Sequence, residues 1–81
     1  MRFSARVDVR LKEGIADPQG QTIERALPAL GYSGVNDVRV GKLIELRLDA
    51  DSPEEARRSV EEMCEKLLAN PVIEAYEVSI R

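Results

Sequence analysis

An unbroken alternation of apolar and polar residues near the start of the chain constrains the fold most. It runs from Phe3 to Lys12. Its apolar members are Phe3, Ala5, Val7, Val9 and Leu11. Because successive side chains of a strand point to opposite faces of a sheet, this pattern predicts a β-strand with one dry face. The sheet that contains this strand therefore has one face turned toward a core.

A helix is predicted after this strand, from about Pro18 to Leu30. Asp17 is a suitable N-cap, and proline suits the first helical position. The apolar stripe of the helix is Ile23, Ala26, Leu27 and Leu30. Gly31 follows as a left-handed stop. Pro28 removes one backbone donor inside the pattern, so we expect a kink or a tightened last turn.

Two further strands are predicted at 35–40 and 43–48, joined by a tight hairpin turn at Gly41 and Lys42. A strict two-residue loop would mix charged side chains into both faces of this hairpin. One additional loop or bulge residue removes the conflict and gives a single apolar surface. The facing pairs are then Val38 with Leu46 and Val40 with Ile44.

The second helix has the clearest local signal in the sequence. Ser52 is a capping serine, Pro53 begins the helix, and Glu55 lies where its carboxylate can reach back to the cap. The inward stripe is Ala56, Val60, Met63, Cys64 and Leu67. Asn70-Pro71 ends the helix, and a last strand is predicted over 73–81.

These 81 residues therefore form a single domain, residues 1–81, with the order strand, helix, strand, strand, helix, strand. The order predicts an α+β fold: a ferredoxin-like βαββαβ arrangement with a four-stranded antiparallel sheet and two helices on one face. The first and third strands are expected to be central. The uncovered face then carries mixed charges, which suit cross-strand pairing or a polar contact between subunits. Its expected residues are Ser4, Arg6, Asp8, Arg10, Arg39, Glu45, Arg47, Glu77 and Ser79.

Composition excludes several classes of function. Twelve basic and fifteen acidic residues give a net charge of −3 and are interleaved, so neither nucleic acid nor a membrane surface is an expected partner. The third expected strand also has no aromatic residue on which an RNA base would stack. The chain has no histidine, which excludes mechanisms that need an imidazole. A single cysteine and the lack of a membrane span or secretory signal predict a cytoplasmic location.

Three features could carry chemistry, and each has a structural interpretation. Cys64 lies at helical spacing from core residues, so a buried thiol is favoured over a nucleophile. The carboxylate pairs of the second helix belong to its solvated side, and Gly41-Lys42 is too short for a phosphate loop. Gln19-Gly20 is harder to explain, because glycine in the first turn of a helix costs up to about 1 kcal/mol. Close backbone approach by a partner, or local packing against Tyr32 or the preceding strand, would explain it.

Longer segments resemble a known family. They are LKEGIADPQG at 11–20, Ala26-Leu27 with Leu30-Gly31, VRVGKLIEL at 38–46, and CEKLLANPVIE at 64–74. In these segments, and over essentially the whole chain, the sequence is similar to the PurS family. Members of that family are the small subunit of phosphoribosylformylglycinamidine synthase, an enzyme of purine biosynthesis. Pro28 departs from the usual helix pattern of the family.

The resemblance implies a complex of three components. A synthetase subunit uses ATP, with magnesium, to activate the formamide oxygen of formylglycinamide ribonucleotide, and a glutaminase subunit releases ammonia. The small subunit bridges the two as a homodimer or homotetramer. Its own chain is expected to hold no catalytic residue, cofactor or metal. This agrees with the residues, because a glutaminase needs a cysteine–histidine pair and a synthetase needs a nucleotide cradle.

The resemblance also marks motif positions as candidate partner contacts, without assigned roles. They are Asp17, Pro18, Gln19, Gly20, Arg39, Gly41, Lys42 and Glu45. Two other functions remain open from the sequence. One is a free-standing ferredoxin-like module that senses a small ligand, and the other is a purely structural homodimer.

Overall fold

The computed structural model describes all 81 residues and contains three strands and two helices. The elements are β1 (Arg2–Leu11), α1 (Pro18–Ala26) with its 3₁₀ continuation η1 (Leu27–Leu30), β2 (Gly41–Asp49), α2 (Pro53–Met63) with its π-helical continuation η2 (Cys64–Leu68), and β3 (Glu74–Ile80). The molecule is long and thin, with extents of 52 × 25 × 14 Å. Neither helix is long and apolar enough to cross a membrane.

The strands form one antiparallel sheet in the order β2-β1-β3. Val7 of β1 lies opposite Ile44 of β2 and Val78 of β3, so the apolar alternations of all three strands share one face. This confirms the predicted dry face of the first strand. On the opposite face, Arg6 lies opposite Glu45 and Ser79, which places mixed charges there as expected.

The core lies between the sheet and α2. Its largest fully buried side chains are Val7, Val60 and Cys64, so the prediction that Cys64 fills the core is confirmed. α2 packs against β1 and β3. Only 10 of the 81 residues are buried in the whole chain. We call these three strands, α2 and η2 the body.

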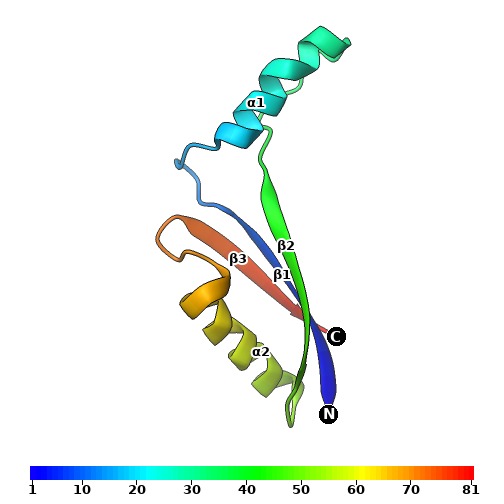
Figure 1. The fold of residues 1–81 in the computed structure, drawn as a ribbon, viewed down its shortest axis with the longest axis vertical. Coiled ribbons are helices and arrows are strands. Elements are labelled where there is room, and N and C mark those ends of the chain that lie inside the picture. The colour runs from blue at the N-terminus through cyan, green and yellow to red at the C-terminus, as the bar shows by residue number, and fades with distance from the viewer.

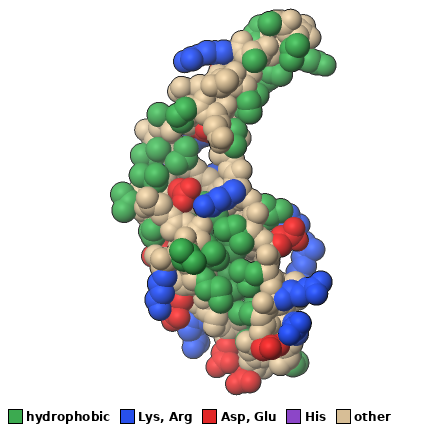
Figure 2. Space-filling model, viewed as in Figure 1, with side chains coloured by type: hydrophobic (Ala, Val, Ile, Leu, Met, Phe, Trp, Pro, Cys, Tyr) green, Lys and Arg blue, Asp and Glu red, His purple; other side chains and the backbone are tan.

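The first helix does not cover the sheet. α1 and η1 project beyond the end of the sheet, and residues 31–40 lead back from the tip of this projection to β2 (Figure 1). We call residues 18–40 the arm and residues 35–40 the return segment. Apolar side chains of the arm are exposed, including Leu30 at 70% and Tyr32 at 60%. Figure 2 shows hydrophobic side chains on the tip of the arm and on the body near α2.

The predicted four-stranded sheet and its hairpin are therefore wrong. Residues 35–40 form no strand, and Gly41 and Lys42 begin β2 instead of turning a hairpin. The pairings proposed for Val38 and Val40 are absent, since β2 pairs with β1. The third predicted strand, β2, consequently lies at the edge of the sheet and only the first is central. The placement of both helices on one face is also wrong, because α1 belongs to the arm.

The predicted helix caps are confirmed, but the inward stripe of the second helix is wrong in part, because Leu67 is 83% exposed and Met63 36% exposed. Asp17 and Ser52 cap α1 and α2 by accepting hydrogen bonds from Gly20 N and Glu55 N, and Glu55 reaches back to the amide of Asp51. Pro28 falls in the tightened 3₁₀ turn, and Gly31 ends it with a φ of 95°. The π-helical turn after α2 was not predicted.

Candidate functional site at the base of the arm

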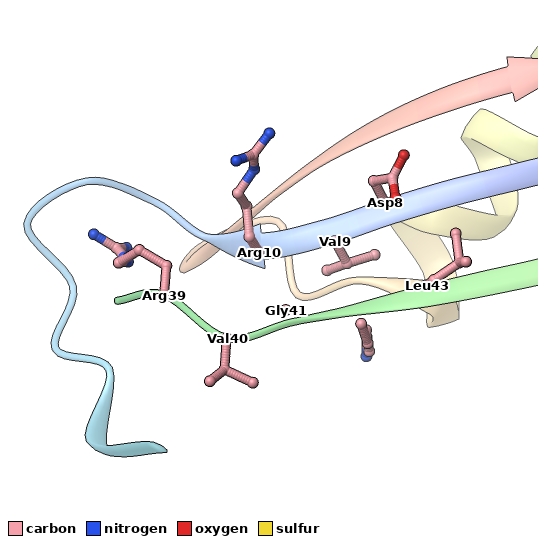
Figure 3. A pocket seen from close by; sticks show the side chains of 8 residues that line it. Asp8, Val9, Arg10, Arg39, Val40, Gly41 and Leu43 are labelled. Carbon is pink, nitrogen blue, oxygen red and sulfur yellow. The ribbon is translucent and has the colours of Figure 1, made fainter. Parts of the chain in front are cut away.

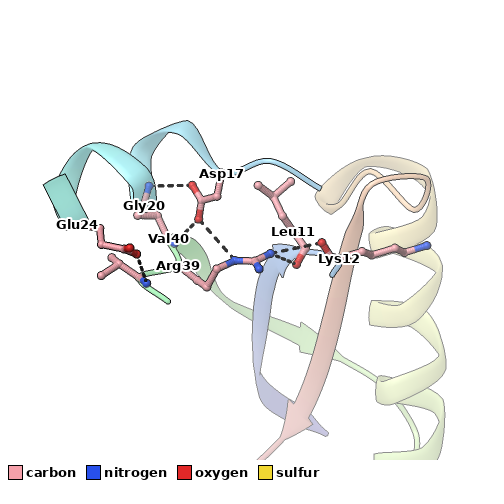
Figure 4. A network of polar contacts seen from close by, with 8 residues as sticks. Leu11, Lys12, Asp17, Gly20, Glu24, Arg39 and Val40 are labelled. Carbon is pink, nitrogen blue, oxygen red and sulfur yellow. Dashed lines mark hydrogen bonds and ion pairs between the residues drawn. The ribbon is translucent and has the colours of Figure 1, made fainter. Parts of the chain in front are cut away.

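Asp17 is the centre of a polar network where the arm meets the body (Figure 4). Its Oδ1 accepts from the amide of Gly20 at 2.9 Å, and its Oδ2 accepts from the amide of Val40 at 2.7 Å. The Nε of Arg39 lies 3.8 Å from the same Oδ2. One buried carboxylate therefore joins the first turn of α1 to the end of the return segment.

Two further side chains complete the network. The Nη2 of Arg39 donates to the carbonyls of Leu11 and Lys12, at 3.1 and 3.3 Å, where β1 ends. The Oε1 of Glu24, the seventh residue of α1, accepts from the amide of Val38 at 3.1 Å. The return segment is thus held to α1 through two alternate backbone amides and to β1 through one guanidinium.

The same contacts explain why the predicted hairpin does not form. The amides of Val38 and Val40 are donors that a strand would offer to a neighbouring strand. Here the carboxylates of Glu24 and Asp17 accept both. An amide needs only one acceptor, so these two half-buried amides are satisfied without joining the sheet.

Gly20 allows this close approach. A Cβ built on Gly20 would lie 2.3 Å from the carbonyl oxygen of Val38 and 2.8 Å from Oδ2 of Asp17. Only glycine fits between these atoms. The sequence suggested close approach by a partner, or local packing against Tyr32 or the preceding strand. The structure instead places the chain's own return segment against Gly20.

The electrostatics keep this network charged at neutral pH. The hydrogen bonds from Gly20 N and Val40 N, with the nearby Arg39 guanidinium, hold the pKa of Asp17 below its ordinary value. Desolvation acts in the opposite direction but is the weaker influence. The carboxylate therefore serves as an acceptor of hydrogen bonds and has no proton to donate.

Two open grooves flank the base of the arm. The first has a volume of about 390 Å³ and is lined by residues of β1, the return segment and β2, with the Arg10 and Arg39 side chains rising around it (Figure 3). The second, of about 370 Å³, lies beside Pro18 and Gln19. Gly41 and Lys42 line both grooves.

The structure brings most of the candidate contact residues together, but in different settings. Those that line the two grooves are Asp17, Pro18, Gln19, Arg39, Gly41 and Lys42. Gly20 is buried beside them, and the polar atoms of Asp17 face inward to the amides described above. Glu45 lies apart, on the open face of the sheet near Arg6. Contact of these residues with a partner stays a prediction.

Sequence reasoning missed the contribution of Glu24 and of the backbone. The partners of Asp17, Arg39 and Glu24 are main-chain amides and carbonyls, which leave no residue-type pattern. One signal was available. The charge conflict in the hairpin register, which needed an extra bulge residue, indicated that the return segment and β2 do not pair.

Two titratable groups of the body lie outside this network. Burial raises the pKa of the Cys64 thiol, with the neighbouring Glu65 and Glu61 charges acting in the same direction, so the thiol is protonated and a poor nucleophile. The Tyr76 hydroxyl donates to Oε2 of Glu65 at 2.6 Å, and this bond raises the pKa of Tyr76 to about 12. No group of three or more acidic or cysteine side chains is placed to hold a metal ion.

The chain is a small α+β domain, in which a thin sheet is covered by one helix and an arm projects beside open grooves. The comparisons with known proteins are specific. The model of the PurS family, described as phosphoribosylformylglycinamidine (FGAM) synthase, matches residues 4–81. The phosphoribosylformylglycinamidine synthase subunit PurS of Methanothermobacter thermautotrophicus is 49% identical over 80 residues, covering 99% of this chain and 94% of the relative.

Solved structures agree with the sequence relatives. A crystal structure of Methanocaldococcus jannaschii PurS superimposes with a TM-score of 0.87 at 43% identity, covering 98% of this chain and 95% of that one. A chain in the structure of PurLQS from Thermotoga maritima gives a TM-score of 0.90 at 40% identity, covering 100% and 99%. The chain belongs to the PurS family.

Proposed function

We propose that this chain is the small subunit of phosphoribosylformylglycinamidine synthase, a glutamine-dependent and ATP-consuming ligase of purine biosynthesis. The observation that carries the proposal is the match over the full chain to a chain of the Thermotoga maritima PurLQS structure. Two relatives named as PurS subunits, from Methanocaldococcus jannaschii and Methanothermobacter thermautotrophicus, are matched over 94% of their length, which supports the proposal.

The role of the chain is assembly rather than chemistry. Its one thiol is buried and protonated, and its one buried carboxylate is occupied by backbone amides. We therefore assign ATP and magnesium to the synthetase subunit and glutamine cleavage to the glutaminase subunit. All three act together in the cytoplasm.

In this mechanism the small subunit holds the two active sites in register, so that ammonia passes between them without escaping to water. Positioning of this kind is worth several kcal/mol through effective concentration. The exposed residues near the grooves are suited to contact the larger subunits. They are Pro18, Gln19, Arg39, Gly41 and Lys42, with Glu45 on the open face of the sheet. Asp17 and Gly20 are buried next to these residues and keep them in position.

The chain also associates with itself, as a homodimer or homotetramer. The small number of buried residues supports this, as do two unpartnered apolar surfaces. One is the apolar side of the arm, and the other is the core side of β2, where Ile44, Leu46 and Leu48 are only half-buried. The arm of a second copy is of the right kind to cover β2, because it supplies the helix that this half of the sheet lacks. Sedimentation of the chain alone tests this, and a monomer at all concentrations contradicts it.

The bridging function is tested with purified synthetase and glutaminase subunits, glutamine, ATP and substrate. Adding this chain should give glutamine-dependent product, and omitting it should abolish that product. Lys42→Glu reverses a charge that borders both grooves and should weaken assembly, whereas Lys66→Glu makes the same change on the exposed side of η2 and should not. Unchanged synthesis without the chain contradicts the proposal. Saturable binding of a small metabolite by the chain alone would favour a ligand sensor instead.

A further inference from the structure

The arm holds a definite direction although it does not pack on the sheet. The main contacts of α1 are with its own continuation η1, and the strands are not among its main neighbours. Of the residues of α1, only Gly20 is buried. Hydrophobic burial therefore does not fix the direction of the arm, and polar contacts at its base must do so.

Those contacts form a closed set between three segments. Asp17 joins α1 to the return segment, because its two oxygens accept from Gly20 and Val40 respectively. Arg39 joins the return segment to the end of β1, because it donates to the carbonyls of Leu11 and Lys12 while its Nε faces Asp17. A rotation of the arm about its base breaks at least one of these contacts.

An N-cap alone does not require this arrangement. Capping of α1 uses only Oδ1 of Asp17 and the amide of Gly20. The second oxygen of Asp17 contacts the return segment, and the guanidinium of Arg39 contacts the end of β1. Gly20 has no side chain, which lets the return segment lie against α1. These features have the geometry of a device that positions the arm.

We propose that Asp17, Gly20 and Arg39 form a latch that fixes the direction of the arm relative to the body. The latch holds the apolar side of α1 away from its own sheet and keeps it available to a partner. This role rests on the proposed function, since a fixed direction matters only if the arm belongs to the assembly surface. The three residues are positioning residues and touch no reacting group.

When the latch is broken, the arm has another position available to it. The sequence pattern of α1 also suits the covered ferredoxin-like arrangement, in which this helix lies on the half of the sheet that α2 leaves bare. A released arm can sample such closed positions and can also swing outward. Loss of the latch should therefore replace one arm direction by several.

The test measures the distance between spin labels at Ala29→Cys, on the tip of the arm, and Glu61→Cys, on α2, in a Cys64→Ala background. Both labelled positions are exposed. Labelled chain is diluted with unlabelled chain, so that only distances within one chain contribute. Asp17→Asn keeps an oxygen for the cap but offers an amide group, which donates, where Oδ2 accepted. Arg39→Gln removes the guanidinium and leaves the cap untouched. Gln21→Ala, on the exposed side of the same helix, is the control.

The latched chain and the Gln21→Ala control should give one narrow distance distribution. Both Asp17→Asn and Arg39→Gln should lose it and give a broad or multiple distribution, with the amide of Val40 exchanging roughly tenfold faster or more. Unchanged strand amides show that the body is folded. If Asp17→Asn unfolds, Arg39→Gln decides alone. A narrow and unshifted distance in folded Arg39→Gln overturns the latch.

The latch and the bridging function can fail separately. The distances are measured on this chain without partners, so an unchanged distance overturns the latch and leaves the bridging function intact. Glutamine-dependent synthesis that does not need the chain overturns the bridging function and leaves the distances unaffected. When both hold, Arg39→Gln should bind the larger subunits more weakly than the control, and cross-linking the arm in its original direction should restore binding.

Discussion

The replacement Gly20→Ala tests whether the close approach of α1 to the return segment stabilises the arm. The added Cβ would lie 2.3 Å from the carbonyl oxygen of Val38, whereas ordinary contacts of this kind begin near 3.4 Å. The two backbones must therefore separate by about 1 Å. A shift of that size stretches the bonds that hold Val38 and Val40.

Two opposing contributions set the change in the stability of the arm in Gly20→Ala. Alanine is the better helix former by about 1 kcal/mol, which favours the variant. Forcing a methyl group into a filled space costs about 1–3 kcal/mol, and here the opposing atoms are backbone and cannot rotate away. We expect the clash to exceed the propensity gain, with a net loss of about 1–2 kcal/mol in the local stability of the arm.

Native-state hydrogen exchange measures this change where it occurs. The amides of α1 and of Val38 and Val40 should exchange about 5- to 30-fold faster in Gly20→Ala, while amides of β1 keep their rates. Gln21→Ala, which adds no clash, should leave the arm amides protected. Slower exchange of the arm amides in Gly20→Ala would mean that helix propensity decides the outcome and that the close approach to Val38 is unimportant.

Three further predictions concern single groups. The pKa of Asp17 is lowered in the folded chain, so the contribution of this carboxylate to folding stability is complete above its ordinary pKa of 3.8 and is lost as pH falls below that value. Protection of the Val40 amide from hydrogen exchange should therefore decline below that pH in the native chain. It should not decline further in Asp17→Asn. The hydrogen bond to Glu65 raises the pKa of Tyr76 to about 12, so the stability that it gives the folded chain is complete below pH 10.0 and is lost between pH 10.0 and 12. An absorbance titration should show the phenolate of Tyr76 forming near pH 12. Glu65→Gln should move this ionisation toward pH 10.0. Val60→Ala should lower the free energy of urea unfolding by about 2–3 kcal/mol, whereas Val72→Ala, at a position 79% exposed, should change it little.

Local patterns predicted the elements that depend on neighbouring residues. The alternation after Phe3 gives β1 its buried face, and the Ser52 and Asp17 caps begin both helices. These signals succeed because strand alternation and capping act over a few residues. The sequence singled out the motifs at 17–20 and 39–42 as candidate contacts, and the structure brings these two motifs together.

The placement of the arm could not be predicted in the same way. An apolar stripe on α1 is equally compatible with a helix on its own sheet and with one that meets another chain. The choice depends on the amides of Val38 and Val40, which bind carboxylates instead of a strand. Contacts from side chains to main chain over 14 and 23 positions have no sequence periodicity, so the return segment was mistaken for a strand.

The central claim is that this chain acts by joining two catalytic subunits and performs no chemistry itself. The most direct measurement compares glutamate released with product formed, at increasing amounts of this chain, in a mixture of the synthetase and glutaminase subunits. We predict that the ratio approaches one product per glutamate as the chain is added, while synthesis from supplied ammonium salt stays constant. A ratio that does not depend on the chain, or product formed by the chain without the larger subunits, would contradict the account.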